Sequence, residues 1–128
     1  MTGRVGEWAA GRSLLDWPDV RRALARAEAV TRVNELLNWQ VAAAAALHVA
    51  DASVTKVFSS EQLQAIGQEL AEVVGRHADP AEPDTDALMT WLDIQLKRNT
   101  VLTFGGGVNE VQRELIATAG LGLPRAPR

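Results

Sequence analysis

The chain has 128 residues, of which 47% are hydrophobic and 23% are charged, and this composition is typical of one globular domain rather than a disordered segment. Cysteine is absent, which excludes disulfides, thiolate metal sites and catalysis by a thiol. The net charge of −3 provides no general attraction to nucleic acid or to an anionic membrane, so neither is expected as a partner.

Residues 1–15 contain three glycines and no persistent hydrophobic period, so we expect an N-terminal arm or the remnant of an earlier element. A helix is predicted to begin at residues 16–19, because proline is tolerated in a first turn and acidic side chains complement the helix dipole. Apolar or small residues then recur every three or four positions, which predicts one long amphipathic helix as far as about Ala50. Its stripe consists of Val20, Ala23, Ala27, Val30, Asn34, Leu37, Val41, Ala44 and His48.

A run of small apolar residues, 41–47, lies near the end of this predicted helix. It is far too short to span a membrane, and no basic start followed by an apolar core marks a signal peptide. We therefore expect a soluble, cytoplasmic protein in which alanines 42–46 form a packing surface.

Three further helices are predicted. The second begins at Asp51 or Ser53 and stops near Gly75, and the third contains Leu88 and Trp91. Residues 77–86 carry two prolines and four acidic side chains, which predicts a solvated loop between them. The fourth helix extends from Asn109 to about residue 119, before a Gly- and Pro-containing stop. No strand-like alternation is present, so we predict an all-α fold, an antiparallel (up-down) four-helix bundle over residues 16–125.

Three consecutive glycines, 105–107, precede the fourth helix and permit positive φ angles and close approach of another molecule. Asn109 is predicted to cap the helix, with Gln112 reaching back as in a capping box. The free N–H groups of this helix start would favour an anionic or carbonyl ligand. The alternative is a flexible turn between two helices.

Other side chains give weaker signals. His48 and His77 stand 29 positions apart and neither has a second histidine at helical spacing, so no metal site is expected. Lys56 is interpreted as a lone helix cation and not as a nucleophile. Trp91 is expected in the core, whereas the tryptophans outside the apolar stripes are candidates for an interface: Trp8, Trp17 and Trp39.

The C-terminal stretch FGGGVNEVQRELIATAGLGLPR resembles the signature of the acyl-CoA dehydrogenase family, which commonly reads GGT-x-E-[IV]-QR and then LGLPR. The stretch ADASVTKVFSSE is similar to the family's A-S-x-x-K-[LV]-F-x-[ST]-E, and a D-P-x-[VI]-R start resembles residues 16–21. The resemblance covers residues 16–125. It implies the family's C-terminal helical domain, FAD as cofactor, and α,β-dehydrogenation of an acyl-CoA thioester.

The resemblance also implies roles for individual residues. Gly106 stands where the family often has its catalytic glutamate, so no catalytic side chain is expected in this chain, and the Gly106 N–H is expected to donate to the thioester carbonyl. Gly107, Val108 and Glu110 join Gly106 as the expected cofactor-binding residues, although Val108 replaces the usual threonine and its hydroxyl. Gln112 and Arg113 are interpreted as cap and surface or interface residues.

Family enzymes also have an N-terminal helical domain, a middle β-domain and an earlier helix in the C-terminal bundle. We therefore expect the chain to contribute a glycine-rich loop to a FAD and thioester site shared with those domains or with a partner subunit, and to a homo- or hetero-oligomer interface. The isolated 128-residue chain is not expected to be active. The alternative is a non-catalytic helical-bundle assembly subunit derived from the family.

Overall fold

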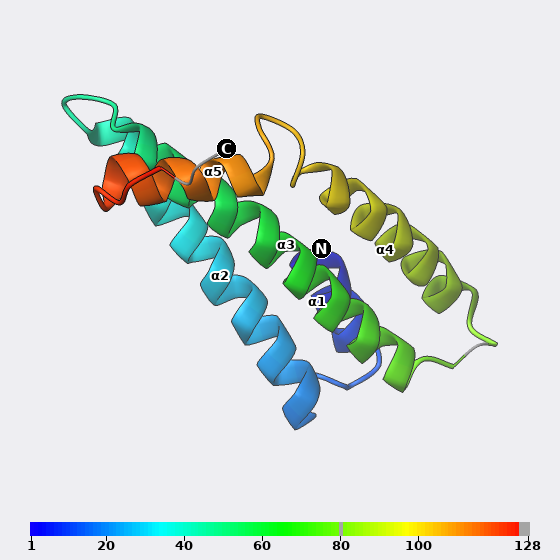
Figure 1. Cartoon of the computed structure of the whole chain (residues 1–128). Helices are drawn as coiled ribbons and strands as arrows, with labels where there is room; N and C mark the ends of the chain where they lie inside the picture. Colours follow the sequence, from blue (N-terminus) through cyan, green and yellow to red (C-terminus); the bar gives the residue numbers. More distant parts are fainter. Residues whose placement is uncertain (80, 126–128) are drawn as a thin grey trace.

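The computed structural model describes residues 1–79 and 81–125, and all regular structure in these residues is helical (Figure 1). The prediction of an all-α fold is therefore confirmed. The elements in chain order are α1 (Thr2–Ala10), α2 (Pro18–Ala43), α3 (Val49–His77), α4 (Pro83–Val101), α5 (Asn109–Leu115) and a π-helical turn, η1 (Ile116–Gly120). Within the described residues, no helix combines the length and the apolarity needed to cross a membrane.

Helix α3 is the centre of the bundle. Helices α2 and α4 pack on either side of it and run antiparallel to it, while α5 and η1 lie across its N-terminal half (Figure 1). In the described parts of α2 and α4, no Cα atom of one helix lies within 8 Å of a Cα atom of the other. The predicted antiparallel bundle is confirmed, and its helices are held together chiefly through α3.

Residues 1–15, expected to be an arm or the remnant of an earlier element, contain the helix α1. Its buried residues, Val5, Trp8 and Ala9, lie at helical spacing and join the same core as Leu70 and Leu92. The indole N–H of Trp8 donates to Thr85 Oγ1 at 3.0 Å, so Trp8 belongs to the core and not to an interface. A helix of nine residues containing glycines is marginal in isolation, and burial of this face is what stabilises it.

The predicted boundaries of the two longest helices were partly wrong. Helix α2 ends at Ala43 rather than near Ala50, and His48 is exposed just before α3 begins. The alanine run is exposed and only its first two residues are helical. Gly75 does not stop α3, whose last turn is instead held by Arg76 and His77, both bonded to Asp19.

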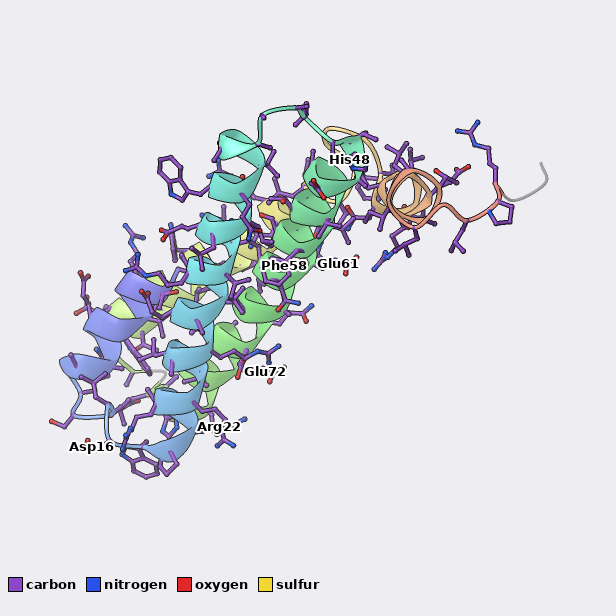
Figure 2. All side chains as sticks on the ribbon, turned by 90° about the vertical axis from the view of Figure 1, so that its left-hand side faces the viewer. Asp16, Arg22, His48, Phe58, Glu61 and Glu72 are labelled. Carbon is purple, nitrogen blue, oxygen red and sulfur yellow. The ribbon has the colours of Figure 1, made fainter. Side chains whose placement is uncertain are left out.

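The core lies at one end of the bundle, where α1 fills the space between α2 and α4. Its fully buried side chains include Val20, Leu70, Val74 and Leu92. At the opposite end no helix of the described chain occupies this space, and α5 lies beside α3 instead (Figure 2). That end carries the glycine-rich connection.

Candidate functional site

The glycine loop, residues 102–108, connects α4 to α5 and is the candidate site. Gly106 and Gly107 have φ values of +70° and +96°, a region that side-chain-bearing residues rarely adopt. A Cβ at Gly106 would meet no atom within 4 Å, and residues 104–107 are exposed. Another molecule can therefore approach the backbone at Gly106 closely.

The loop also presents hydrogen-bond donors outward. Gly105 N donates to Val101 O at 3.0 Å, which closes the last turn before the glycines. Within the part of the chain that the structure describes, the Gly106 and Gly107 N–H groups have no protein acceptor. They are free to donate to a carbonyl or an anion brought by another molecule.

The predicted capping box is absent. Asn109 is the first residue of α5, and its side chain is buried at 4% exposure and turned toward α3 instead of capping its own helix. Gln112 Nε2 donates to Gly106 O at 3.2 Å, so this side chain supports the loop rather than the helix start. The prediction failed because packing against α3 offered Asn109 better partners than its own backbone did.

Four residues of α3 and α5 form a polar network around the Asn109 side chain. Ser60 Oγ donates to Asn109 Oδ1 at 3.1 Å, and Asn109 Nδ2 donates to Glu61 Oε1 at 3.2 Å. Lys56 Nζ donates both to Asn109 Oδ1 and, at 3.2 Å, to Thr103 O. Glu61 also pairs with Arg113 at 2.6 Å. The network ties the two ends of the glycine loop to α3.

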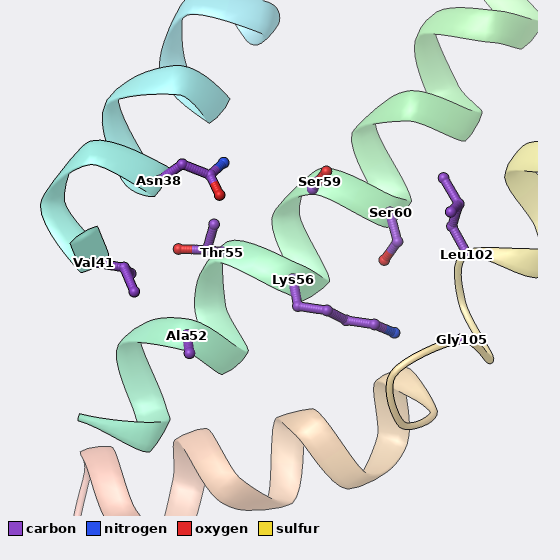
Figure 3. A pocket seen from close by; sticks show the side chains of 9 residues that line it. All are labelled: Asn38, Val41, Ala52, Thr55, Lys56, Ser59, Ser60, Leu102 and Gly105. Carbon is purple, nitrogen blue, oxygen red and sulfur yellow. The ribbon is translucent and has the colours of Figure 1, made fainter. Parts of the chain in front are cut away.

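A groove of about 370 Å³ lies next to this network, between α2, α3 and the glycine loop (Figure 3). Val41, Ala52 and Leu102 provide apolar wall, and the Lys56 side chain extends along the groove toward Gly105 (Figure 3). The groove is at the end of the bundle that α1 does not reach.

A family model described as "Acyl-CoA dehydrogenase, C-terminal domain" matches residues 6–121. The chain belongs to the acyl-CoA dehydrogenase family.

Two acyl-CoA dehydrogenases of Mycobacterium tuberculosis are similar in sequence. FadE29 is 53% identical over 131 residues, covering 98% of this chain and 34% of the relative. FadE26 is 39% identical and covers 97% of this chain and 34% of the relative. The chain therefore spans about a third of the length of these curated relatives.

Two solved structures are similar in fold and sequence. One is the crystal structure of the ChsE4-ChsE5 complex from Mycobacterium tuberculosis, with a TM-score of 0.82 and 36% identity, covering 98% of this chain and 34% of that one. The other is the Tcur3481-Tcur3483 steroid ACAD, with a TM-score of 0.82, 35% identity and the same coverage.

In this acyl-CoA dehydrogenase domain, the residues expected at the cofactor lie on one short segment. Gly106 and Gly107 are at the tip of the loop, Val108 is half-buried before α5, and Glu110 is exposed in its first turn. Their backbone is open to another molecule at the loop tip. Arg113, the nearest cation after the loop, is already paired with Glu61, which leaves little positive charge for a diphosphate.

Sequence reasoning missed Lys56, Ser60 and Glu61. Lys56 and Ser60 are four positions apart and therefore share one face of α3, and all three stand at the specified positions of the K-[LV]-F-x-[ST]-E stretch. That spacing was the available signal. Asn109, the residue that all three contact, occupies a position that the C-terminal signature leaves unspecified.

The two histidines lie apart from the glycine loop. His77 bonds Asp19 at the other end of the bundle, and His48 is exposed at the start of α3. Among residues 1–79 and 81–125, no three His, Asp or Glu side chains gather as a metal site would require.

Proposed function

We propose that the chain is the C-terminal helical domain of a flavin-dependent acyl-CoA dehydrogenase and that its glycine loop completes the FAD and thioester site. The observation that carries the proposal is the exposed, positive-φ backbone of Gly106, whose N–H has no acceptor in the described chain. The family membership supports it.

Gly106 would act through its backbone. Its N–H would donate to the thioester carbonyl oxygen, where negative charge grows when the α-proton leaves, and such donors stabilise the developing charge. Gly107, Val108 and Glu110 would border the cofactor. FAD, when bound, supplies the electron acceptor for forming the α,β double bond.

The base that removes the α-proton must come from elsewhere. Glycine cannot accept a proton, and Gly106 is at the position where the family often has its glutamate. We propose that the base belongs to the part of the enzyme that precedes this domain or to a partner subunit.

The substrate class follows from the family. We propose an acyl-CoA thioester of lipid metabolism, and the likeness to a steroid ACAD favours a bulky acyl group over a short one. The same proposal assigns the reaction to the cytoplasm, where acyl-CoA metabolism of this kind is expected.

We propose that residues 16–125 form most of the domain and that residues 1–15, whose helix α1 joins the same core, are the end of an earlier helix of its bundle. The relatives are about three times as long as this chain, which leaves room for such a helix. The Met1 side chain lies close to Gly67 of α3 and Asn99 of α4. We propose that this helix, extended beyond the N-terminal end of α1, would fill the groove beside the glycine loop.

Oligomerisation is part of the proposal. The ChsE4-ChsE5 structure is a complex of two kinds of subunit, which supports a homo- or hetero-oligomer here. The outer face of α2 offers Leu36 and Trp39, which are 64% and 71% exposed. Large apolar side chains of this exposure usually find a partner surface.

Reconstitution tests the proposed function. The chain is co-expressed with the N-terminal and middle domains of an acyl-CoA dehydrogenase that lack their own C-terminal domain. The purified complex is assayed for bound flavin and for bleaching of the flavin absorbance on addition of acyl-CoA. We expect a yellow complex that bleaches. A stable complex that holds no flavin would contradict the proposal.

The second candidate is a non-catalytic assembly subunit that retained the packing surface of the family. The lack of a carboxylate at Gly106 favours it. In that case the chain would join an oligomer with a complete dehydrogenase subunit, and Gly107→Ala, which distorts the glycine loop, would leave the turnover of that oligomer unchanged.

A further inference from the structure

We propose that Lys56 is a positioning residue: its ammonium group clamps both ends of the glycine loop to α3 and so fixes the direction of the Gly106 N–H. The inference deepens the proposed function, since it concerns the donor that would meet the thioester. Lys56 lies 50 positions before Gly106 in the sequence and on a different element.

The glycine loop needs such support because the helices it joins do not support each other. Among the described residues no Cα atom of α4 lies within 8 Å of one in α5, and each helix packs separately on α3. The glycines themselves are exposed and make few internal bonds. A loop of this kind samples many conformations unless its ends are fixed.

Lys56 contacts the loop on both sides of the glycines. Its Nζ donates to Thr103 O before them and to Asn109 Oδ1 after them. Thr103 O also accepts from Asn109 N at 3.1 Å, so one carbonyl joins the two ends of the loop. Ser60, one turn along α3 from Lys56, holds the Asn109 side chain through bonds of 3.0 and 3.1 Å.

The chemistry of lysine suits this role. An ammonium group carries three rotatable donors on a flexible stem and can reach acceptors on two different elements, and its charge strengthens each bond. Both acceptors are neutral oxygens, and within the described chain no carboxylate lies within ion-pair distance of Lys56. The lysine therefore serves the loop backbone and its Asn109 support rather than a surface ion pair.

Gln112 completes the support from the other side. Its amide donates to Gly106 O and so holds the carbonyl of the glycine whose N–H has no acceptor in the described chain. A Cβ at Gly107 would lie 2.7 Å from Gln112 Nε2, so the glutamine side chain is folded directly against the loop. With Lys56 fixing the ends and Gln112 the tip, the loop keeps one shape.

The test compares Lys56→Met, which keeps the length of the stem and removes the donors, with Lys97→Met. Lys97 is the matched control because it is an exposed lysine that pairs with Asp93 on α4, away from the loop. For each chain, ¹⁵N relaxation and amide hydrogen exchange are measured together with the urea unfolding midpoint.

In Lys56→Met we expect the order parameter of the Gly106 amide to fall from about 0.8 to below about 0.6, the range of flexible backbone. The Asn109 amide, which donates to Thr103 O, should exchange at least about tenfold faster, while amides of α2 and α4 keep their protection. Lys97→Met should match the wild type. Unchanged loop order in Lys56→Met, with only a lower unfolding midpoint, would overturn the proposal.

A measurement on the wild-type chain covers the case in which Lys56→Met fails to fold. The Lys56 ammonium protons should exchange with water at least about tenfold more slowly than those of Lys97, because they are held by two acceptors. Equal exchange would overturn the clamp. The proposed function fails independently, if the reconstituted complex lacks flavin while the clamp is present.

Discussion

Ser60 and Asn109 exchange hydrogen bonds across the contact between α3 and α5, with Ser60 Oγ donating at 3.1 Å and Asn109 Nδ2 donating at 3.0 Å. The Ser60 hydroxyl has one proton, which reaches either Asn109 Oδ1 or, at 3.2 Å, Val57 O, and its oxygen can accept from Asn109 Nδ2 when the proton is donated to Val57 O. Because both residues are buried, their polar atoms depend on each other and not on water.

Replacing Asn109 with alanine should destabilise the chain. The change removes the side chain that Ser60 and Lys56 share and leaves them only Val57 O and Thr103 O as acceptors, and loss of a buried hydrogen-bond partner costs about 1–3 kcal/mol. Urea unfolding of Asn109→Ala measures the loss. Ser59→Ala is the control, since Ser59 lies on the same turn of α3 outside this network; equal losses in both variants would contradict the prediction.

The link between Asp19 and His77 predicts a pH dependence. The pKa of Asp19 is lowered from 3.8 to about 2, chiefly by its hydrogen bond with His77 and also by Arg76. A carboxylate with a lowered pKa stabilises the fold above about pH 3.8 and loses this contribution as the pH falls toward 2.

We therefore expect the urea midpoints of the wild type and Asp19→Asn to differ at pH 5 and to converge as the pH approaches 2. Asp93→Asn, which removes an exposed i,i+4 pair with Lys97, should differ little from the wild type at pH 5. A gap that is the same at pH 5 and at pH 2 would argue against the bond.

The glycines of the loop should tolerate alanine differently. Gly106→Ala should cost about 1 kcal/mol, because its φ of +70° is unfavourable for alanine although the space around it is open. Gly107→Ala should cost more, since its Cβ would also lie 2.7 Å from Gln112 Nε2. Gly3→Ala, in the exposed face of α1, should instead stabilise the chain by about 0.5–1 kcal/mol. Denaturant unfolding of the three variants measures the change in the free energy of unfolding for each, and a smaller loss for Gly107→Ala than for Gly106→Ala would contradict the prediction.

The isolated chain should self-associate through the outer face of α2. Trp39 is 71% exposed and has Leu36 one turn away, which forms an apolar patch without a partner in the described chain. Trp39→Gln should weaken association at least about tenfold by light scattering, whereas Gln68→Ala, an exposed polar change on α3, should not. A monomeric wild type at micromolar concentration would refute this prediction.

The isolated chain should bind FAD with a dissociation constant above about 1 μM, which corresponds to a binding free energy weaker than about 8 kcal/mol. The glycine loop offers backbone donors on an exposed edge but no enclosed apolar wall for the flavin ring, and Val108 offers no hydroxyl. Fluorescence titration of FAD into the chain measures this. Tighter binding would mean that the bundle alone forms a complete site.

The sequence by itself determined that the chain is helical and where the glycine loop lies. Hydrophobic spacing within one helix is a local property, so residues such as Val20, Ala23 and Ala27 were correctly placed in the core. The family resemblance also needed no tertiary information, because the motif letters are contiguous.

Only the tertiary structure decided the parts that depend on contacts between distant segments. Helix α1 exists because Val5 and Trp8 find Leu70 and Thr85, and α2 ends at Ala43 although alanine itself favours helix. Lys56 and Asn109 each had an unremarkable local interpretation, as a surface cation and as a helix cap. Their actual partners lie 47 to 53 positions away in the sequence. These contacts form because α5 packs across α3, and a local sequence pattern does not encode that packing.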